Sequence, residues 1–309
     1  MSDTVNTKSG KKTQSSLYDQ LGASASKDGI HQAIDAAGLV DKDGLFARVN
    51  SDLAGDPDFL SVLHCDGAGT KAIVAYLAFR ETGDVSWFSG LSRDALVMNL
   101  DDVYCLGQPQ SMLLANAIAR NAKIIPDAVI AELIKSYREA VEELRQYGVN
   151  IELSGGETAD MGDVVRTLVV DATLVARIAK QNLIRPERVV AGDVIVGLAS
   201  TGQARWEKKP NSGIGSNGLT LARHCLLSSS YRQDYPESCE PSSPADVAYR
   251  GPYKVSDTPA ELSGMSVAEA LLSPTRSFAP VLDKLLTTLG DKIHALIHVT
   301  GGGLTKVSR

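Results

Sequence analysis

The chain has 309 residues, of which 43% are hydrophobic and 22% charged, and its net charge at pH 7 is −6. This length corresponds to about two domains of average size, and the composition is globular rather than disordered. The acidic balance argues against nucleic acid and anionic membranes as partners, and no apolar run reaches the roughly 18 residues of a membrane span.

The first 16 residues are polar and contain no apolar segment, so we expect a frayed arm rather than a secretory leader. The four cysteines are too few and too irregularly spaced for a disulfide scaffold, and no pair has zinc-site spacing. They are Cys65, Cys105, Cys225 and Cys239. A reducing, cytoplasmic location fits this pattern best.

The first predicted element is a buried strand over residues 59–65, which runs into the glycine-rich segment 66–71. A helix is predicted to follow. Glycines at such a junction let backbone N–H groups approach an anion, and Lys71 can neutralise a phosphate. The spacing differs from a Walker A loop, which has Ser or Thr after its lysine. A tight turn with a surface lysine is the alternative interpretation.

A second helix, predicted over residues 94–106, carries carboxylates on an otherwise apolar sequence. Asp94 and Asp101 are two turns apart and share a face, whereas Asp102 lies about 100° around the helix. Acids in apolar surroundings need partners, and nucleotide-bound Mg²⁺ accepts carboxylate ligands. The alternative is an ordinary helix, in which an acid near the N-terminus interacts with the helix dipole and the acids at the other end are solvated.

A strand over residues 111–119 and a helix over residues 126–147 follow; the helix has Pro126 near its first turn and Gly148 as its stop signal. The alternation of strands and helices favours an α/β (α+β) fold, a sheet layered with helices.

A further strand, predicted over residues 149–153, enters a second glycine turn at residues 154–158, where Glu157 adds a carboxylate. Gly-Gly pairs are common in ordinary turns, so this segment alone is a weak functional signal. A strand over residues 164–178 ends the first half of the chain.

The segment 182–192 is the best candidate for a domain boundary. Beyond it the sequence predicts strands over residues 193–199 and 293–300, and helices over residues 216–227, 266–272 and 278–289. Residues 228–263 exceed normal loop length, which indicates a mobile insertion or a lid. His294 and His298 have zinc-site spacing, but their run reads as a strand, so we reject a metal site there.

Six motifs in order resemble the phosphoribosylformylglycinamidine cyclo-ligases, also called aminoimidazole ribonucleotide synthetases. They are Asp66-Gly67-x-Gly69-Thr70-Lys71; Asp94 with Met98-Asn99 and Asp102; Gly155-Gly156-Glu157-Thr158-Ala159; Ser216-Asn217-Gly218; Pro274-Thr275-Arg276; and His298-x-Thr300-Gly301-Gly302-Gly303. The third motif is the most specific of the six.

The resemblance implies a two-domain ATP-binding fold: an arm (residues 1–57), an ATP-binding domain that forms a homodimer (58–183) and a C-terminal α/β domain (184–309). It also implies that ATP converts the amide oxygen of formylglycinamidine ribonucleotide into a leaving group, after which ring closure gives aminoimidazole ribonucleotide, ADP and phosphate.

The resemblance also implies roles for individual residues. Metal ligands for Mg²⁺–ATP would be Asp66, Asp94, Asp102 and Glu157. Other nucleotide contacts would come from Gly67, Gly69, Thr70, Lys71, Gly155, Gly156 and Thr158. The phosphorylated substrate would be held by Ser216, Asn217, Gly218, Thr300, Gly301 and Gly302. Catalytic roles fall to Lys71, Asp94 and His298.

This sequence departs from the family pattern in several places. The family usually has Asn where Asp101 stands, the loop after Asp160 is altered, and Arg309 follows the last glycine turn by six residues, so we expect a divergent member with an incomplete second domain. Two alternatives stay open: a selenophosphate or thiamine-phosphate kinase-like enzyme, and a nucleotide-binding module without catalysis. A selenophosphate enzyme would need a reactive cysteine in residues 21–30, which contain none.

Overall fold

The computed structural model of the chain describes residues 16–24, 28–38 and 44–308. The predicted arm of residues 1–16 therefore lies outside these ranges, except for Ser16, which caps the first helix. The strands are β1 (Asn50–Ser51), β2 (Phe59–Gly67), β3 (Pro109–Arg120), β4 (Glu152–Asp160) and β5 (Leu168–Ala179). The α-helices are α1 (Leu17–Gln20), α2 (Asp28–Ala36), α3 (Lys71–Thr82), α4 (Ser89–Tyr104), α5 (Asp127–Arg145), α6 (Leu219–Leu226), α7 (Ser230–Asp234), α8 (Val267–Leu272) and α9 (Ala279–Leu289).

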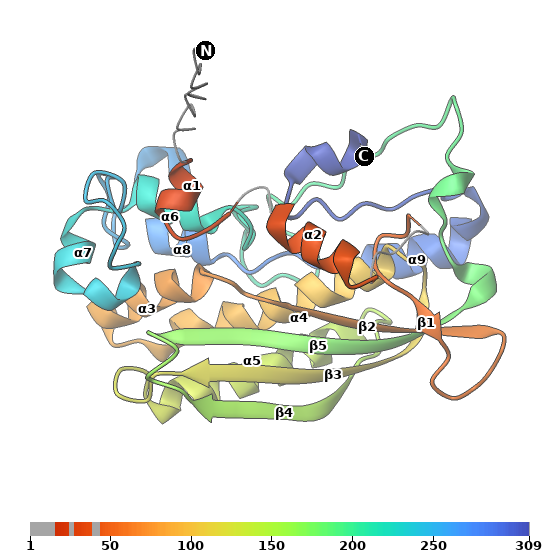
Figure 1. The fold of residues 1–309 in the computed structure, drawn as a ribbon, viewed down its shortest axis with the longest axis horizontal. Coiled ribbons are helices and arrows are strands. Elements are labelled where there is room, and N and C mark those ends of the chain that lie inside the picture. The colour runs from red at the N-terminus through yellow and green to blue at the C-terminus, as the bar shows by residue number, and fades with distance from the viewer. Residues whose placement is uncertain (1–15, 25–27, 39–43, 309) are drawn as a thin grey trace, which may run out of the picture.

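The five strands form one sheet in the order β1-β2-β5-β3-β4 (Figure 1). Only β3 and β4 are parallel, and α5 makes the crossover that a parallel connection requires. The other neighbours are antiparallel. The mixed sheet with helices confirms the predicted fold class.

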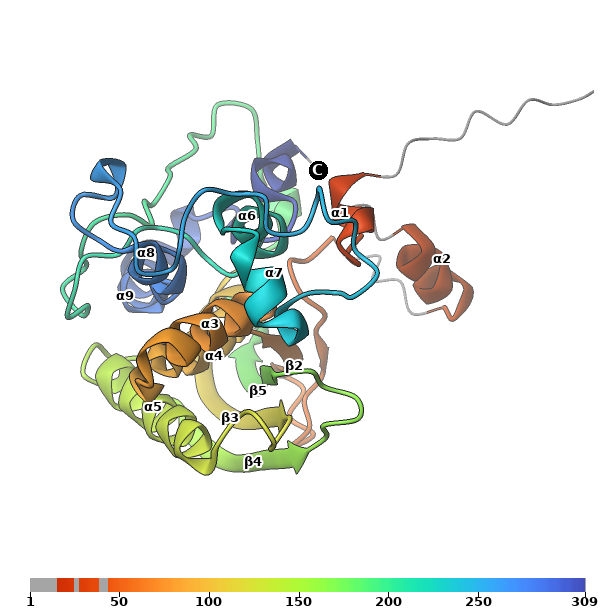
Figure 2. The ribbon, with the colours of Figure 1, turned by 90° about the vertical axis from the view of Figure 1, so that its left-hand side faces the viewer.

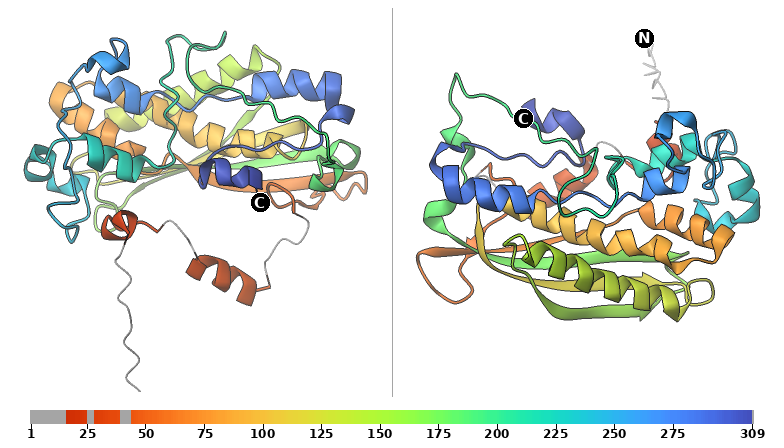
Figure 3. Two further views of the ribbon diagram at one scale, coloured as in Figure 1. Left: turned by 90° about the horizontal axis from the view of Figure 1, so that it is seen from above. Right: turned by 180° about the vertical axis from the view of Figure 1, so that it is seen from behind.

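Helices α3, α4 and α5 lie on one side of the sheet (Figure 2). Strand β5 alternates strictly, with its even-numbered residues from Leu168 to Ile178 buried toward these helices. Helix α5 buries one apolar stripe, whereas α4 is buried nearly all round because the second half of the chain covers its outer side (Figure 3).

Two predicted strands are not present. Residues 193–199 and 293–300 have no sheet partner among the described residues, and Val194 and Ile195 are 85% and 82% exposed. Their β-branched residues favour extended backbone, but a strand needs a neighbour to accept its hydrogen bonds. These two predictions were wrong for this chain.

Residues 228–263 are not a loose insertion. They contain α7 and short 3-10 turns, and they bury Tyr231 and Tyr249 at 1% and 0% exposure. The Tyr231 hydroxyl donates to Glu81 on α3, which ties the segment to the first half of the chain. Length alone suggested mobility, but both tyrosines pack into the main hydrophobic core, which the first half of the chain also forms.

No helix among the described residues is long and apolar enough to cross a membrane.

Candidate functional site

The glycine segment after β2 leads directly into α3, as predicted. Gly67 has no room for a side chain, because a Cβ there would lie 1.7 Å from Asp171 Oδ1 and 2.7 Å from the Val170 carbonyl oxygen. Gly69 has a φ of +56°, a conformation that favours glycine. The structure therefore explains both glycines by the tight path of the backbone.

Asp66 and Asp171 lie near each other at this junction but on opposite faces of the sheet, because Asp66 pairs with the buried Ala172 and Asp171 pairs with Gly67. Burial, and then the negative charge of Asp66, raise the pKa of Asp171. The Asp66 carboxylate also accepts a hydrogen bond from the Gly67 N–H at 2.7 Å. Asp171 was not among the predicted site residues; strand alternation in β5 would have placed it on the face opposite the buried even-numbered residues.

Lys71 does not face solvent. Its side chain is fully buried, and Nζ donates to Asp94 Oδ1 at 2.9 Å and to the Ser273 carbonyl at 2.6 Å. Thr275 donates to the same Asp94 oxygen through its backbone N–H (2.7 Å) and its hydroxyl (2.6 Å). The other oxygen, Asp94 Oδ2, is buried and has no hydrogen-bond partner among the described residues.

Asp101, on α4, binds the two residues that precede α9. Its carboxylate accepts from the Ser277 hydroxyl at 2.9 Å and the Phe278 N–H at 2.8 Å. Burial raises the pKa of Asp101 to about 6, although the positive field of His298 opposes the rise. The acid that distinguishes this chain from the family pattern thus contacts the protein's own second half.

Asp102 lies between two histidines. His298 Nδ1 is 2.6 Å from Asp102 Oδ1, and His64 Nε2 is 3.3 Å from Oδ2. Burial opposes ionisation of Asp102, but hydrogen bonds from His298 and His64 outweigh it and lower its pKa. Asp102 and His298, which were predicted separately as a metal ligand and a catalytic residue, are therefore in direct contact.

His64 was missed by sequence reasoning. Its Nδ1 lies 2.9 Å from Asn99 Oδ1, so both ring nitrogens face oxygen acceptors. Burial lowers the pKa of His64, but the hydrogen bonds to Asp102 and Asn99 outweigh this and raise it. Residues 64 and 66 share a face of β2 by strand alternation, which was the available signal.

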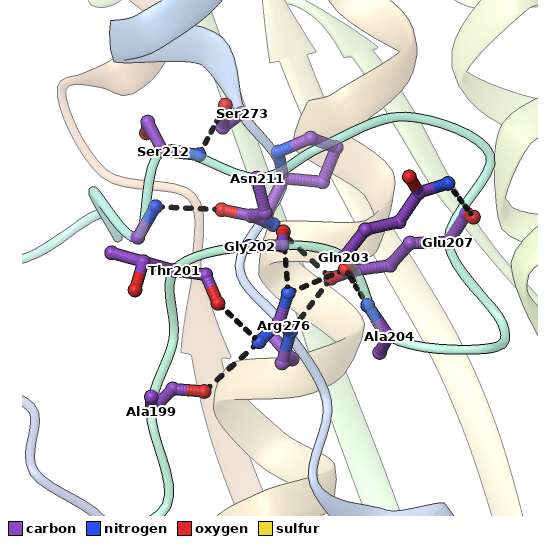
Figure 4. Close-up of polar contacts among 12 residues, drawn as sticks. Ala199, Thr201, Gly202, Gln203, Ala204, Glu207, Asn211, Ser212, Ser273 and Arg276 are labelled. Carbon is purple, nitrogen blue, oxygen red and sulfur yellow. Dashed lines mark hydrogen bonds and ion pairs between the residues drawn. The ribbon is translucent and has the colours of Figure 1, made fainter.

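Arg276 holds a loop in the second half of the chain (Figure 4). It makes two hydrogen bonds to the Glu207 carboxylate, at 2.9 and 2.5 Å. It also donates to the carbonyls of Ala199, Thr201 and Gly202 at 2.9 to 3.0 Å. Every nitrogen of the Arg276 guanidinium donates to the loop 199–207, so this motif arginine stabilises the loop.

The two predicted substrate motifs meet each other. Gly218 begins α6 with a φ of +77°, and Asn217 Nδ2 would lie 3.6 Å from a Cβ at Gly301. Ser216 Oγ is buried and unpartnered within the described ranges. The Thr70 and Thr220 hydroxyls, 2.8 Å apart, join α6 to the glycine segment before α3.

Gly155 and Gly156 do not form a turn; they lie within β4, at the sheet edge. A Cβ at Gly156 would lie 2.3 Å from Asn116 Oδ1 on β3, where the strand register shifts. Glu157 pairs with Ala117, Ala117 with Asp171, and Asp171 with Gly67. Glu157 is thus three strand spacings, about 14 Å, from β2.

The four predicted magnesium ligands do not meet in this arrangement. Glu157 lies across the sheet, both Asp102 oxygens face histidines, and Asp94 alone has an unpartnered buried oxygen. Among the residues that the structure describes, no group of three or more His, Cys, Asp or Glu side chains could hold a metal ion. Magnesium binding stays a prediction.

Comparison with known proteins identifies relatives of this chain. Residues 47–178 match the family model described as AIR synthase related protein, N-terminal domain. Phosphoribosylformylglycinamidine cyclo-ligase of Methanocaldococcus jannaschii is 30% identical over 254 residues, which are 82% of this chain and 58% of the relative. The enzyme of the same name from Pyrococcus horikoshii is 29% identical over 252 residues, 82% and 59% of the two chains.

The chain thus spans less than two thirds of the length of these two curated relatives. Among solved structures, thiamine monophosphate kinase from Aquifex aeolicus is 12% identical, with a TM-score of 0.37 over 53% of this chain and 46% of that one.

Proposed function

Because residues 47–178 match the family model of AIR synthase related N-terminal domains and the chain is similar to the phosphoribosylformylglycinamidine cyclo-ligases, we propose that it acts in ATP-dependent imidazole ring closure in the cytoplasm. The reaction would convert formylglycinamidine ribonucleotide and ATP into aminoimidazole ribonucleotide, ADP and phosphate, with Mg²⁺ as the accompanying ion. The similarity over 254 residues, which are 82% of this chain, is the observation that carries this proposal.

In this proposal residues 58–183 bind the nucleotide and residues 184–309 bind the ribonucleotide. The contacts described above support it in part: Asn217 lies beside Gly301, and Thr70 contacts Thr220 on α6. Substrate bound by the two glycine motifs would therefore lie near the start of α3. The chemistry needs positioning and charge stabilisation more than a nucleophile, since the amide oxygen is activated by ATP.

Lys71 and Asp94 then act by positioning. Their ion pair joins α3 to α4 and holds Thr275 and Ser273, so it fixes the two halves of the proposed site relative to each other. The contact between His298 Nδ1 and Asp102 Oδ1 fixes the His298 ring next to the glycine motif that begins at Thr300. These are proposed roles for residues that the resemblance singled out.

The proposal includes a homodimer through the uncovered face of the sheet. Leu113 pairs with Val175, and Val175 with Leu63, so the three side chains form an apolar row across β3, β5 and β2. Leu63 and Leu113 are 64% and 44% exposed. A second copy, packed face to face, would cover this row in a self-complementary interface.

The test is an assay with purified protein, formylglycinamidine ribonucleotide, ATP and Mg²⁺, which follows aminoimidazole ribonucleotide and ADP together. Formation of both, dependent on the ribonucleotide, would support the proposal. ATP binding without either product would favour the nucleotide-binding module instead.

A further inference from the structure

A cavity of about 280 Å³ lies where α3 begins, between the β4–β5 connection and the segment after α7. Its lining includes Thr70, Ile73, Arg166, Arg223 and Ser238. No motif of the sequence singled out Arg166, Arg223 or Ser238. The cavity therefore brings residues without an assigned role to the end of the glycine segment.

Arg223 is a buried cation without an acidic partner. Its side chain belongs to α6 and the residue is only 5% exposed. Nη1 donates to the Ser238 carbonyl at 2.9 Å and to the Tyr249 hydroxyl at 2.8 Å, both neutral groups. Nε is buried and makes no hydrogen bond, and no carboxylate of the described residues pairs with this guanidinium. An uncompensated buried charge is costly, so the site is electrostatically incomplete.

The acids that line the same cavity are already neutralised. Glu237 accepts from the Tyr76 hydroxyl and pairs with Arg80 at 3.5 Å. Glu240 pairs with Arg166. Both carboxylates are therefore paired with other cations, and the charge of Arg223 is left without a carboxylate partner at the cavity.

Two further features favour a negative group there. Helix α3 is 12 residues long, and its N-cap residue Thr70 makes no side-chain capping bond. The Ile73 N–H donates to the Thr70 carbonyl oxygen at 3.1 Å, whereas the N–H groups of Lys71 and Ala72 have no acceptor among the residues that the structure describes, so the positive dipole end of α3 keeps donors for an anion. Ser238 is 1% exposed, and its hydroxyl has no partner within the described ranges. A hydroxyl, a guanidinium N–H and a helix start together match an oxyanion.

The surroundings carry more positive charge. Burial raises the pKa of the Cys239 thiol, and the charges of Arg232, Arg223 and Arg166 oppose that rise. Arg232 Nη1 is likewise buried and unpartnered in the described part of the chain. Arg223 thus lines the cavity as an unpaired cation, and the charge of Arg232 acts on Cys239, which also lines it.

We propose that this cavity is an anion-binding site for a phosphate group, in which Arg223 and Ser238 hydrogen-bond the phosphate oxygens and the start of α3 faces it. The site stands on Arg223, Ser238 and the cavity, so it does not depend on the cyclo-ligase activity. Phosphate binding without turnover would support this site and contradict only the proposed reaction.

The experiment is calorimetric titration of the full chain with inorganic phosphate at constant ionic strength set with sodium chloride. Arg223→Met keeps an apolar stem and removes the charge, and we expect about a tenfold or greater loss of phosphate affinity. Arg250→Met is the matched control, because Arg250 is exposed, lies in the segment 228–263 that also carries Ser238, and donates from its guanidinium to Cys225 Sγ at 3.4 Å. We expect it to bind phosphate as the wild type does.

Ser238→Ala keeps the carbonyl that Arg223 uses and removes only the hydroxyl, so it tests the site even if Arg223→Met does not fold. We expect a several-fold loss of affinity. A wild type that binds no phosphate beyond the sodium chloride control would overturn the proposal. So would unchanged affinity in both Arg223→Met and Ser238→Ala.

Discussion

At the scale of single residues, the carboxylates of α4 form hydrogen bonds and ion pairs with other residues of the chain. Asp94 holds Lys71 and Thr275, Asp101 holds Ser277, and Asp102 holds two histidines. The sequence indicated that these carboxylates need partners. It could not identify them, because Thr275 and His298 lie 181 and 196 positions away.

The Lys71–Asp94 pair gives the first prediction. Lys71→Met leaves Asp94 buried with an uncompensated charge, so we expect the free energy of unfolding to fall by about 3–5 kcal/mol. Lys135→Met is the matched control, since Lys135 is 60% exposed and pairs with glutamates on the surface of α5. Urea unfolding measures both, and an equal change in the two variants would contradict the account.

His224 gives a prediction about pH. Burial, and then the charge of Arg223, lower its pKa from 6.5 to about 3. Below about pH 6.5, His224 is protonated in the unfolded chain but stays neutral in the folded chain. The free energy of unfolding therefore decreases as the pH falls below about 6.5. Between pH 7 and pH 5 this contribution is about 2 kcal/mol.

His224→Asn keeps an acceptor for the Tyr249 N–H that His224 Nδ1 now binds at 3.1 Å, but it cannot titrate. We expect its free energy of unfolding to vary less between pH 5 and pH 7 than that of the wild type. His31→Asn, at an exposed histidine on α2, should leave the wild-type profile unchanged. If His224→Asn and the wild type have parallel profiles, the histidine is not held neutral by burial.

At the scale of elements, strongly patterned segments were predicted well. The helix expected over residues 126–147 is α5, Asp127–Arg145, because its apolar stripe and stop glycine are local signals. The glycine turn expected at residues 154–158 is part of β4. Glycine usually marks a turn, but here Gly156 lets Asn116 approach where the register of β3 shifts, a feature of pairing that sequence alone does not carry.

The junction between β2 and α3 gives a third prediction. Gly67→Ala places a methyl group against Asp171 and the Val170 carbonyl, and we expect it to destabilise the fold by about 1–3 kcal/mol. Gly197→Ala is the control, since nothing lies within 4 Å of a Cβ there. Thermal unfolding should separate the two; a Gly67→Ala protein as stable as the control would show that the junction can relax.

At the scale of the whole molecule, α4 is the central element. One side packs on β2 and β5, and the other binds the second half of the chain through its acids. The α/β class could be predicted from the alternation of strands and helices along the sequence. The order of the strands in the sheet could not be predicted, because neighbours such as β2 and β5 lie far apart in sequence.

The uncovered sheet face gives the fourth prediction. Leu113→Glu puts a charge into the apolar row of the proposed dimer interface, so we expect dissociation to monomers in sedimentation equilibrium. Leu289→Glu is the control: Leu289 lies on α9 and is 42% exposed, close to the 44% of Leu113. A wild type that is monomeric, or a Leu113→Glu protein that stays dimeric, would contradict an interface on this face.

The central claim is that this divergent chain closes an imidazole ring at the expense of ATP. It is tested most directly by the ratio of aminoimidazole ribonucleotide to ADP formed by the purified chain with formylglycinamidine ribonucleotide, ATP and Mg²⁺. The account predicts that the two products appear in equal amounts, and that omitting the ribonucleotide abolishes ADP release. ADP release that is independent of the ribonucleotide, or the absence of aminoimidazole ribonucleotide, would contradict it.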